Sequence, residues 1–141
     1  MCQLHAIAAK DEALQWGRFR SGGVTISGTD YQPPLASSLD KHWFELVQSA
    51  KAITNIIDRA ITVFLTMART QFFYDVNKRM GRFMMNGILL SEGYPAINVP
   101  AKRQVEFNEL MINFYNTADM NPMNVFLRSC VPAAVIEIMM E

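Results

Sequence analysis

The sequence has few cysteines, few charged residues and no long apolar run, and each shortage excludes a class of protein. Its two cysteines, Cys2 and Cys130, lack the close spacing of metal ligands, which indicates a reducing compartment. Thirteen basic residues balance 13 acidic ones, so no overall field attracts nucleic acid or an anionic membrane. No apolar run reaches the roughly 18 residues of a membrane span, and residues 1–5 carry no signal pattern. We therefore expect a cytoplasmic protein that binds neither nucleic acid nor membrane.

Apolar side chains, in contrast, make up half of the sequence. That content favours a well-buried globular fold over disorder, and 141 residues suit one core. The abrupt start is typical of the trimmed start of a longer protein. No internal repeat or linker divides the chain, so we expect residues 1–141 to form a single domain.

Apolar residues recur at helical spacing through most of the chain, which predicts an all-α bundle of about seven helices. The clearest stripe lies in residues 52–69. Residues 80–91 are apolar almost all round, which predicts a buried central helix that ends before Gly93. The other helices are expected at 3–15, 36–50, 101–117, 121–128 and 133–140.

Residues 18–34 break the helical pattern. Val24, Thr25 and Ile26 alternate as in a strand, between Gly22-Gly23 and Gly28. We expect a short β-hairpin or extended flap over about residues 22–32. It is either an ordinary surface loop or an edge strand that pairs with an extended segment of another protein.

A cluster of polar and charged residues separates the two central helices. It consists of Asp75, Asn77, Lys78, Arg79 and Arg82. The second helix is expected to start beside it, where backbone N–H groups without intrahelical partners form an anion site with the helix dipole. Three cations at that end repel one another and oppose the dipole, and a polyanion relieves both effects.

Asp75 lies just before these cations. A hard carboxylate beside phosphates is a usual ligand of Mg²⁺, so the cluster indicates a triphosphate bound with magnesium. The alternative is that Asp75 caps the helix and pairs with Arg79.

The stretch from Gln71 to Arg82 resembles the signature of Fic-domain proteins. That signature reads His, any residue, Phe, any residue, Asp or Glu, Gly or Ala, Asn, Gly or Lys, Arg, any two residues, Arg. The positions that match in register are Phe73, Asp75, Asn77, Lys78, Arg79 and Arg82. The resemblance extends to the flap and to the Asn121-Pro122 stretch, so it covers nearly the whole chain.

The resemblance implies a bacterial protein of toxin type that transfers AMP from ATP to a Ser, Thr or Tyr hydroxyl of a target protein. It implies that Asp75 holds Mg²⁺. The implied nucleotide site consists of Val76, Asn77, Lys78, Arg79, Gly81 and Arg82, with Tyr115 near the adenine. The implied target-docking residues of the flap are Val24, Thr25, Ile26, Ser27 and Gly28.

Such domains are usually restrained by a helix with a Ser/Thr-x-x-x-Glu-Gly/Asn motif, which this sequence lacks. Restraint is then expected from a partner chain of the antitoxin kind, from a trimmed N-terminal region, or not at all.

Three positions depart from the family pattern. Gln71 stands where the family has its His, which accepts the proton of the target hydroxyl, and a carboxamide has no usable basicity. The resemblance therefore implies an inactivated enzyme, engineered or a natural pseudoenzyme, and the intact remainder of the site favours the engineered variant.

The second departure, Val76, replaces Gly or Ala and restricts the backbone of the anion nest. The third, Lys78, is typical of the death-on-curing toxins, which are kinases. Arg82 favours AMP transfer over that alternative. A non-catalytic module that binds a nucleotide or a partner is the remaining alternative.

Overall fold

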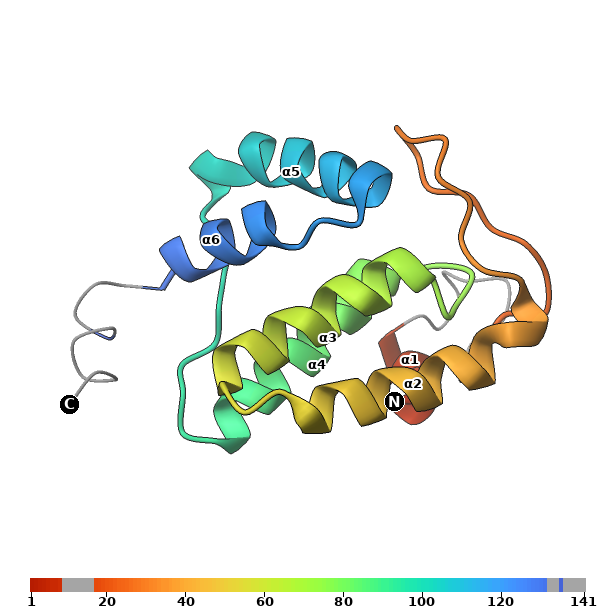
Figure 1. The fold of residues 1–141 in the computed structure, drawn as a ribbon, viewed down its shortest axis with the longest axis horizontal. Helices are drawn as coiled ribbons and strands as arrows, with labels where there is room; N and C mark the ends of the chain where they lie inside the picture. Colours follow the sequence, from red (N-terminus) through yellow and green to blue (C-terminus); the bar gives the residue numbers. More distant parts are fainter. Residues whose placement is uncertain (9–16, 132–134, 136–141) are drawn as a thin grey trace.

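The structure is a computed structural model that describes residues 1–8, 17–131 and 135. Within these ranges the chain forms six α-helices and two short 3₁₀ helices and contains no strand (Figure 1). The 3₁₀ helices are η1 (Ala36–Ser38) and η2 (Ala101–Arg103). The α-helices are α1 (Cys2–Ala8), α2 (Leu39–Ala52), α3 (Ile56–Thr70), α4 (Asn77–Ser91), α5 (Gln104–Thr117) and α6 (Asn121–Ser129).

The predicted all-α class is therefore confirmed. The expected count of seven helices is not supported, because the last of them, at 133–140, lies almost wholly outside the described residues. The second half of the first expected helix, from residue 9, also lies outside them.

Helices α3 and α4 form the centre of the molecule (Figure 1). Asn55 begins α3 because its side-chain oxygen accepts a hydrogen bond from the Asp58 N–H (3.0 Å). The two helices approach closely at Gly81, where an added Cβ would lie 2.9 Å from Cδ2 and 3.0 Å from the carbonyl oxygen of Phe64. The absence of a side chain at Gly81 thus lets α3 and α4 pack closely. Helix α4 begins at Asn77, three residues earlier than the sequence predicts.

Two groups of buried side chains hold the helices together. The larger joins all four later helices through residues such as Phe64, Leu89, Phe107 and Phe126. The smaller contains Leu46, Met67, Met80, Phe72, Phe73 and Val76 and so includes the α3–α4 loop (residues 71–76). Because that loop is part of a core, its backbone is held in one conformation.

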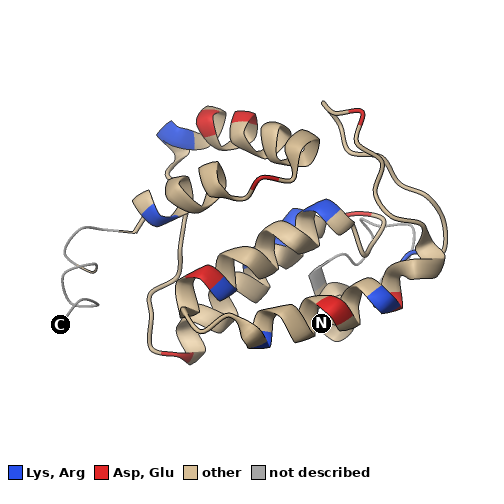
Figure 2. Cartoon of the chain, viewed as in Figure 1, with Lys and Arg blue, Asp and Glu red and all other residues tan. Residues whose placement is uncertain are grey.

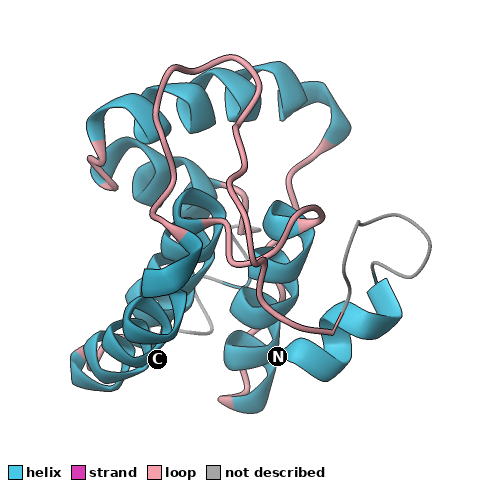
Figure 3. Ribbon diagram, turned by 90° about the vertical axis from the view of Figure 1, so that its right-hand side faces the viewer, coloured by secondary structure: helices cyan, strands magenta, loops and turns pink. Residues whose placement is uncertain are grey.

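The flap (residues 22–32) is an irregular loop, and the prediction of a β-hairpin is wrong. Figure 3, seen from the side of the flap, shows it as a loop that runs past α5. A lone pair of strands is marginal in water, and Gly28 turns the chain at a φ of 88°. Side chains support the flap instead, since Thr29 hydrogen-bonds Asn116 of α5 and the Arg69 guanidinium lies 3.9 Å from the centre of the Tyr31 ring.

Helices α2 and α3 carry charged residues of both signs, whereas those of α4 are all basic and gather at its start (Figure 2). None of the helices in the described part of the chain has the length and apolar character needed to cross a membrane.

Candidate functional site

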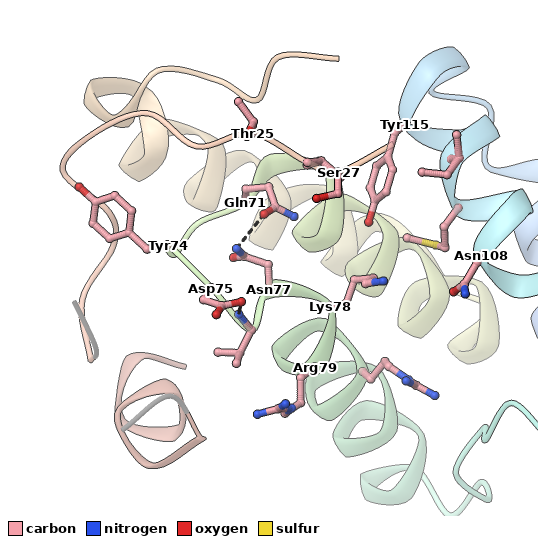
Figure 4. Close-up of a pocket in the computed structure, with 15 residues that line it drawn as sticks. Thr25, Ser27, Gln71, Tyr74, Asp75, Asn77, Lys78, Arg79, Asn108 and Tyr115 are labelled. Carbon is pink, nitrogen blue, oxygen red and sulfur yellow. Dashed lines mark hydrogen bonds between the residues drawn. The ribbon is translucent and has the colours of Figure 1, made fainter. Parts of the chain in front are cut away.

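A pocket of about 740 Å³ opens between the flap, the α3–α4 loop, the start of α4 and one face of α5 (Figure 4). The flap contributes Thr25, Ile26 and Ser27. The loop and α4 contribute Gln71, Tyr74, Asp75, Val76, Asn77, Lys78, Arg79 and Arg82. Helix α5 contributes Asn108, Met111, Ile112 and Tyr115.

The structure thus brings most of the predicted site residues to one pocket. Three do not line it: Val24, Gly28 and Gly81. Gly81 instead faces Phe64 in the core, so its effect on the pocket is limited to how α4 packs.

The sequence analysis missed Tyr74 and three residues of α5. Asn108, Met111 and Ile112 precede Tyr115 by seven, four and three positions. These are the spacings of one helix face, so the expectation about Tyr115 already contained the signal that identifies them.

Asn77 holds the α3–α4 loop closed. It is 6% exposed. Its Oδ1 accepts a hydrogen bond from the Phe73 N–H (2.9 Å), and its Nδ2 donates to the Phe73 carbonyl (2.8 Å) and to Gln71 Oε1 (2.9 Å). Both amide protons are therefore used within the loop. The side chain of Asn77 therefore shapes the pocket by fixing the loop.

Gln71 ends α3 in the left-handed conformation, with φ 57° and ψ 66°. Its Nε2 donates to the carbonyl of Ala68, and its Oε1 accepts from Asn77 (Figure 4). The carboxamide therefore connects the last turn of α3 to the first turn of α4. It has no lone pair basic enough to take a proton from a hydroxyl near neutral pH.

Val76, the residue before α4, is also left-handed, with φ 55° and ψ 24°. A β-branched residue rarely adopts this conformation, which costs about 1–2 kcal/mol. The side chain is 9% exposed within the smaller core group, and this burial offsets the strain. The loop thereby keeps the backbone path that a glycine adopts without strain.

Asp75 lies at the exposed edge of the pocket. Its Oδ1 accepts a hydrogen bond from the Val76 N–H (2.7 Å). In the part of the chain that the structure describes, no three His, Cys, Asp or Glu residues gather where they could hold a metal. A cation at Asp75 would therefore need oxygen atoms of a ligand or water to complete its coordination.

His5 of α1 supports the loop from behind and was not predicted to do so. Its ring is fully buried and stacks on Phe73 with 3.7 Å between ring centres. Its Nδ1 accepts from the Gly17 N–H (3.1 Å), so the proton lies on Nε2, which faces the Asp75 carbonyl (3.4 Å). Burial lowers the pKa of His5, which keeps the ring neutral.

Three cations, Lys78, Arg79 and Arg82, line the pocket from the first two turns of α4. The first intrahelical hydrogen bond of α4 runs from the Met80 N–H to the Val76 carbonyl (2.9 Å). Tyr115 is buried on the facing wall, and this burial raises its pKa to about 12, so its hydroxyl stays neutral. The pocket is suited to a ligand with several negative charges.

The fold and the pocket define a helical domain in which the start of a central helix, three cations and one carboxylate line one pocket. The chain belongs to the Fic/DOC family, whose model matches residues 1–89. The resemblance seen in the sequence is thus confirmed at the level of the family.

Two curated relatives carry the name protein adenylyltransferase Fic. The relative from Nematostella vectensis is 27% identical over 128 residues, which are 86% of this chain and 29% of the relative. That from Drosophila mojavensis is 24% identical over 125 residues, 84% of this chain and 24% of the relative. The chain thus spans less than a third of the length of either, and a bacterial origin and a toxin role stay predictions.

Solved structures show the same fold. A Fic family protein from Desulfovibrio desulfuricans G20 superposes with a TM-score of 0.81 at 22% identity, over 98% of this chain and 45% of that one. Fic-1 from C. elegans superposes with a TM-score of 0.72 at 19% identity, over 98% of this chain and 41% of that one.

Proposed function

We propose that the pocket binds ATP and that the chain is a Fic domain of the AMP-transferring kind, with transfer strongly slowed by Gln71. The observation that carries the proposal is the meeting of Asp75, Lys78, Arg79 and Arg82 in one pocket at the start of α4. The relatives are named protein adenylyltransferases, which supports the choice of ATP as donor and of a protein as acceptor.

The phosphates would lie against the first turn of α4. The N–H groups of Asn77 and Lys78 precede the first hydrogen bond of that helix. Lys78, Arg79 and Arg82 add charge-assisted hydrogen bonds from side chains. The Asn77 amide is engaged within the loop, so its contribution is to hold the loop in the shape that receives phosphate.

Asp75 fits a magnesium ion that arrives with the nucleotide. One hard carboxylate at the pocket edge matches the way Mg²⁺ is held by one or two protein oxygens, phosphates and water. When bound, the ion would neutralise phosphate charge and orient the phosphates. Asp75 is fixed for this role because its Oδ1 is held by the Val76 N–H.

The flap would bind the target. Thr25, Ile26 and Ser27 line the pocket opposite the start of α4, and an extended target segment could pair with their backbone groups. Such pairing would bring a target hydroxyl to Gln71. The neutral hydroxyl of Tyr115 would contact the adenine of the nucleotide. An inhibitory partner chain of the antitoxin kind remains a prediction.

Gln71 would leave nucleotide binding intact and slow the transfer. Its carboxamide is held by Ala68 and Asn77, so it preserves the loop. Loss of a general base costs roughly 10²–10⁴ in rate. A chain with residual transfer would be a slow enzyme, and one that binds the nucleotide without any transfer would be a non-catalytic module.

Binding is tested by thermal unfolding with MgATP. ATP at about 100 times its Kd would stabilise the native chain by about 2.7 kcal/mol. Asp75→Ala and Arg79→Ala should abolish the resulting rise in melting temperature. Arg103→Ala is the matched control, since Arg103 is a cation at the start of α5 that pairs with Glu106 outside the pocket. Equal shifts in all variants would refute the site.

Phosphate transfer is the second candidate, and Lys78, which lines the pocket from the first turn of α4, favours it. Gln71→His with ATP labelled at the α or the γ phosphate separates the two reactions. Label from the α phosphate on protein supports AMP transfer, whereas label from the γ phosphate alone supports a kinase. No label on any protein in a lysate would contradict both.

A further inference from the structure

Arg20 lies buried at the base of the flap and bonds to four backbone carbonyls. The residue is 3% exposed. Its Nε donates to the Gln71 carbonyl (2.5 Å) and its Nη1 to that of Gly22 (2.9 Å). Its Nη2 donates to the carbonyls of Pro34 (2.5 Å) and Thr70 (3.3 Å). The backbone N–H of Arg20 donates to the Phe72 carbonyl (2.9 Å), so the main chain is held as well.

These carbonyls belong to two structures that meet only in space. Thr70 and Gln71 form the C-terminal end of α3, where the helix dipole favours a cation. Gly22 is the first residue of the flap, and Pro34 lies just after its end. One guanidinium thus holds the two ends of the flap together. It also bonds them to the backbone of Gln71, the residue in the general-base position. Because the flap contains no strand pairing, this fastening replaces a hydrogen-bond ladder.

Arginine suits this task better than lysine. Its planar fork presents donors in several fixed directions, whereas an ammonium group presents three donors at one point. Burial lowers the pKa of Arg20 from its very high ordinary value, and the group remains a cation at neutral pH. The carbonyl dipoles compensate its charge in place of a carboxylate.

We propose that Arg20 is the positioning residue that holds the target-docking flap and the Gln71 backbone in one fixed geometry. Its consequence for transfer rests on the function proposed above, whereas its control of the flap does not. Without Arg20 the two ends of the flap separate and the flap samples many positions. Thr29 and Tyr31 still contact α5 and α3. A target strand on such a flap would no longer present its hydroxyl at a constant distance from residue 71.

The order of the flap is measured by double electron–electron resonance between two spin labels. The labels are carried by Gly23→Cys in the flap and Lys51→Cys at the end of α2, in a chain with Cys2→Ser and Cys130→Ser. Gly23 is exposed, and a Cβ added to it meets no atom within 4 Å. Lys51 is exposed too.

Two substitutions at Arg20 are compared with one matched control. Arg20→Met removes all side-chain donors, and Arg20→Lys keeps the charge and a long stem in case the first variant does not fold. Arg59→Lys is the control, because Arg59 also donates from Nε to a backbone carbonyl, that of Ile53 (3.0 Å), far from the flap. We expect each folded Arg20 variant to at least double the width of the distance distribution, and Arg59→Lys to leave it unchanged.

An unchanged width in Arg20→Lys, together with a lower melting temperature, would overturn the proposal and make Arg20 a core residue only. The second arm adds Arg20→Lys to the Gln71→His chain. There we expect at least tenfold less α label on protein, with the thermal shift by MgATP retained. If Gln71→His alone transfers no label, the proposed function fails, and the label distances still decide the role of Arg20.

Discussion

Asn77→Ala tests whether this side chain holds the loop or binds phosphate. The substitution removes three hydrogen bonds, two to the backbone of Phe73 and one to Gln71. A typical hydrogen bond contributes about 1 kcal/mol, so we expect a loss of about 3 kcal/mol. Phe73 is fully buried, so water cannot easily replace the lost partners of its N–H and carbonyl.

At roughly 2–4 °C per kcal/mol for a chain of this size, this loss lowers Tm by about 10 °C. Calorimetry measures the shift, and titration with MgATP then measures binding at a temperature where the variant is folded. We expect binding to weaken as well, because the first turn of α4 loses its fixed loop. A shift below about 2 °C combined with lost binding would refute this reasoning and make Asn77 a direct phosphate ligand.

Asn86→Ala is the matched control for that experiment. Asn86 holds Ile97 in the same way, through Oδ1 to the Ile97 N–H (2.9 Å) and Nδ2 to its carbonyl (3.3 Å), away from the pocket. It should lower Tm and leave MgATP binding unchanged. Equal loss of binding in both variants would mean that binding only reports general stability.

Two further predictions concern stability. Gly81→Ala places a methyl group 2.9 Å from Phe64 and should lower the free energy of unfolding in urea by about 1–3 kcal/mol. Gly87→Ala on the open face of α4 should raise it by up to about 1 kcal/mol. A gain in stability at both sites would refute the close helix crossing. A hydrogen bond from Arg128 (2.5 Å) lowers the pKa of Asp58, so this pair stabilises the fold above about pH 4 and its contribution is lost as pH falls through the lowered pKa. Asp58→Asn should therefore show a smaller loss of unfolding free energy between pH 6 and pH 3, and an unchanged loss would contradict the pairing.

The helices could be predicted because their signal is local. The stripe in residues 52–69 predicts α3, and Asn121-Pro122 predicts the start of α6, within a few residues of where they lie. The flap could not be predicted in the same way. Alternation at Val24–Ile26 is a local strand signal, but a strand also needs a partner ladder, and in this chain the buried Arg20 supports the segment instead.

Most residues expected at the site line one pocket, whereas the hydrogen bonds among them were not predicted. Asp75, Lys78, Arg79 and Arg82 stand together in sequence, so their meeting in one pocket follows from the helix start. The roles of His5 and Arg20 depend on contacts between residues far apart in sequence, which no periodicity reveals. Both residues are buried, and nothing in the local sequence around either of them indicates this.

The pocket is proposed to hold ATP but to lack a base at residue 71. This is tested by single-turnover transfer of label from the α phosphate to protein in a cell lysate, at saturating MgATP, by the chain with Gln71 and by Gln71→His. Histidine tolerates the left-handed conformation of residue 71, so the loop should keep its shape. We predict that Gln71→His transfers label roughly 10²–10⁴ times faster, with ATP affinity unchanged. Equal rates in the two chains, each with ATP bound, would contradict the claim.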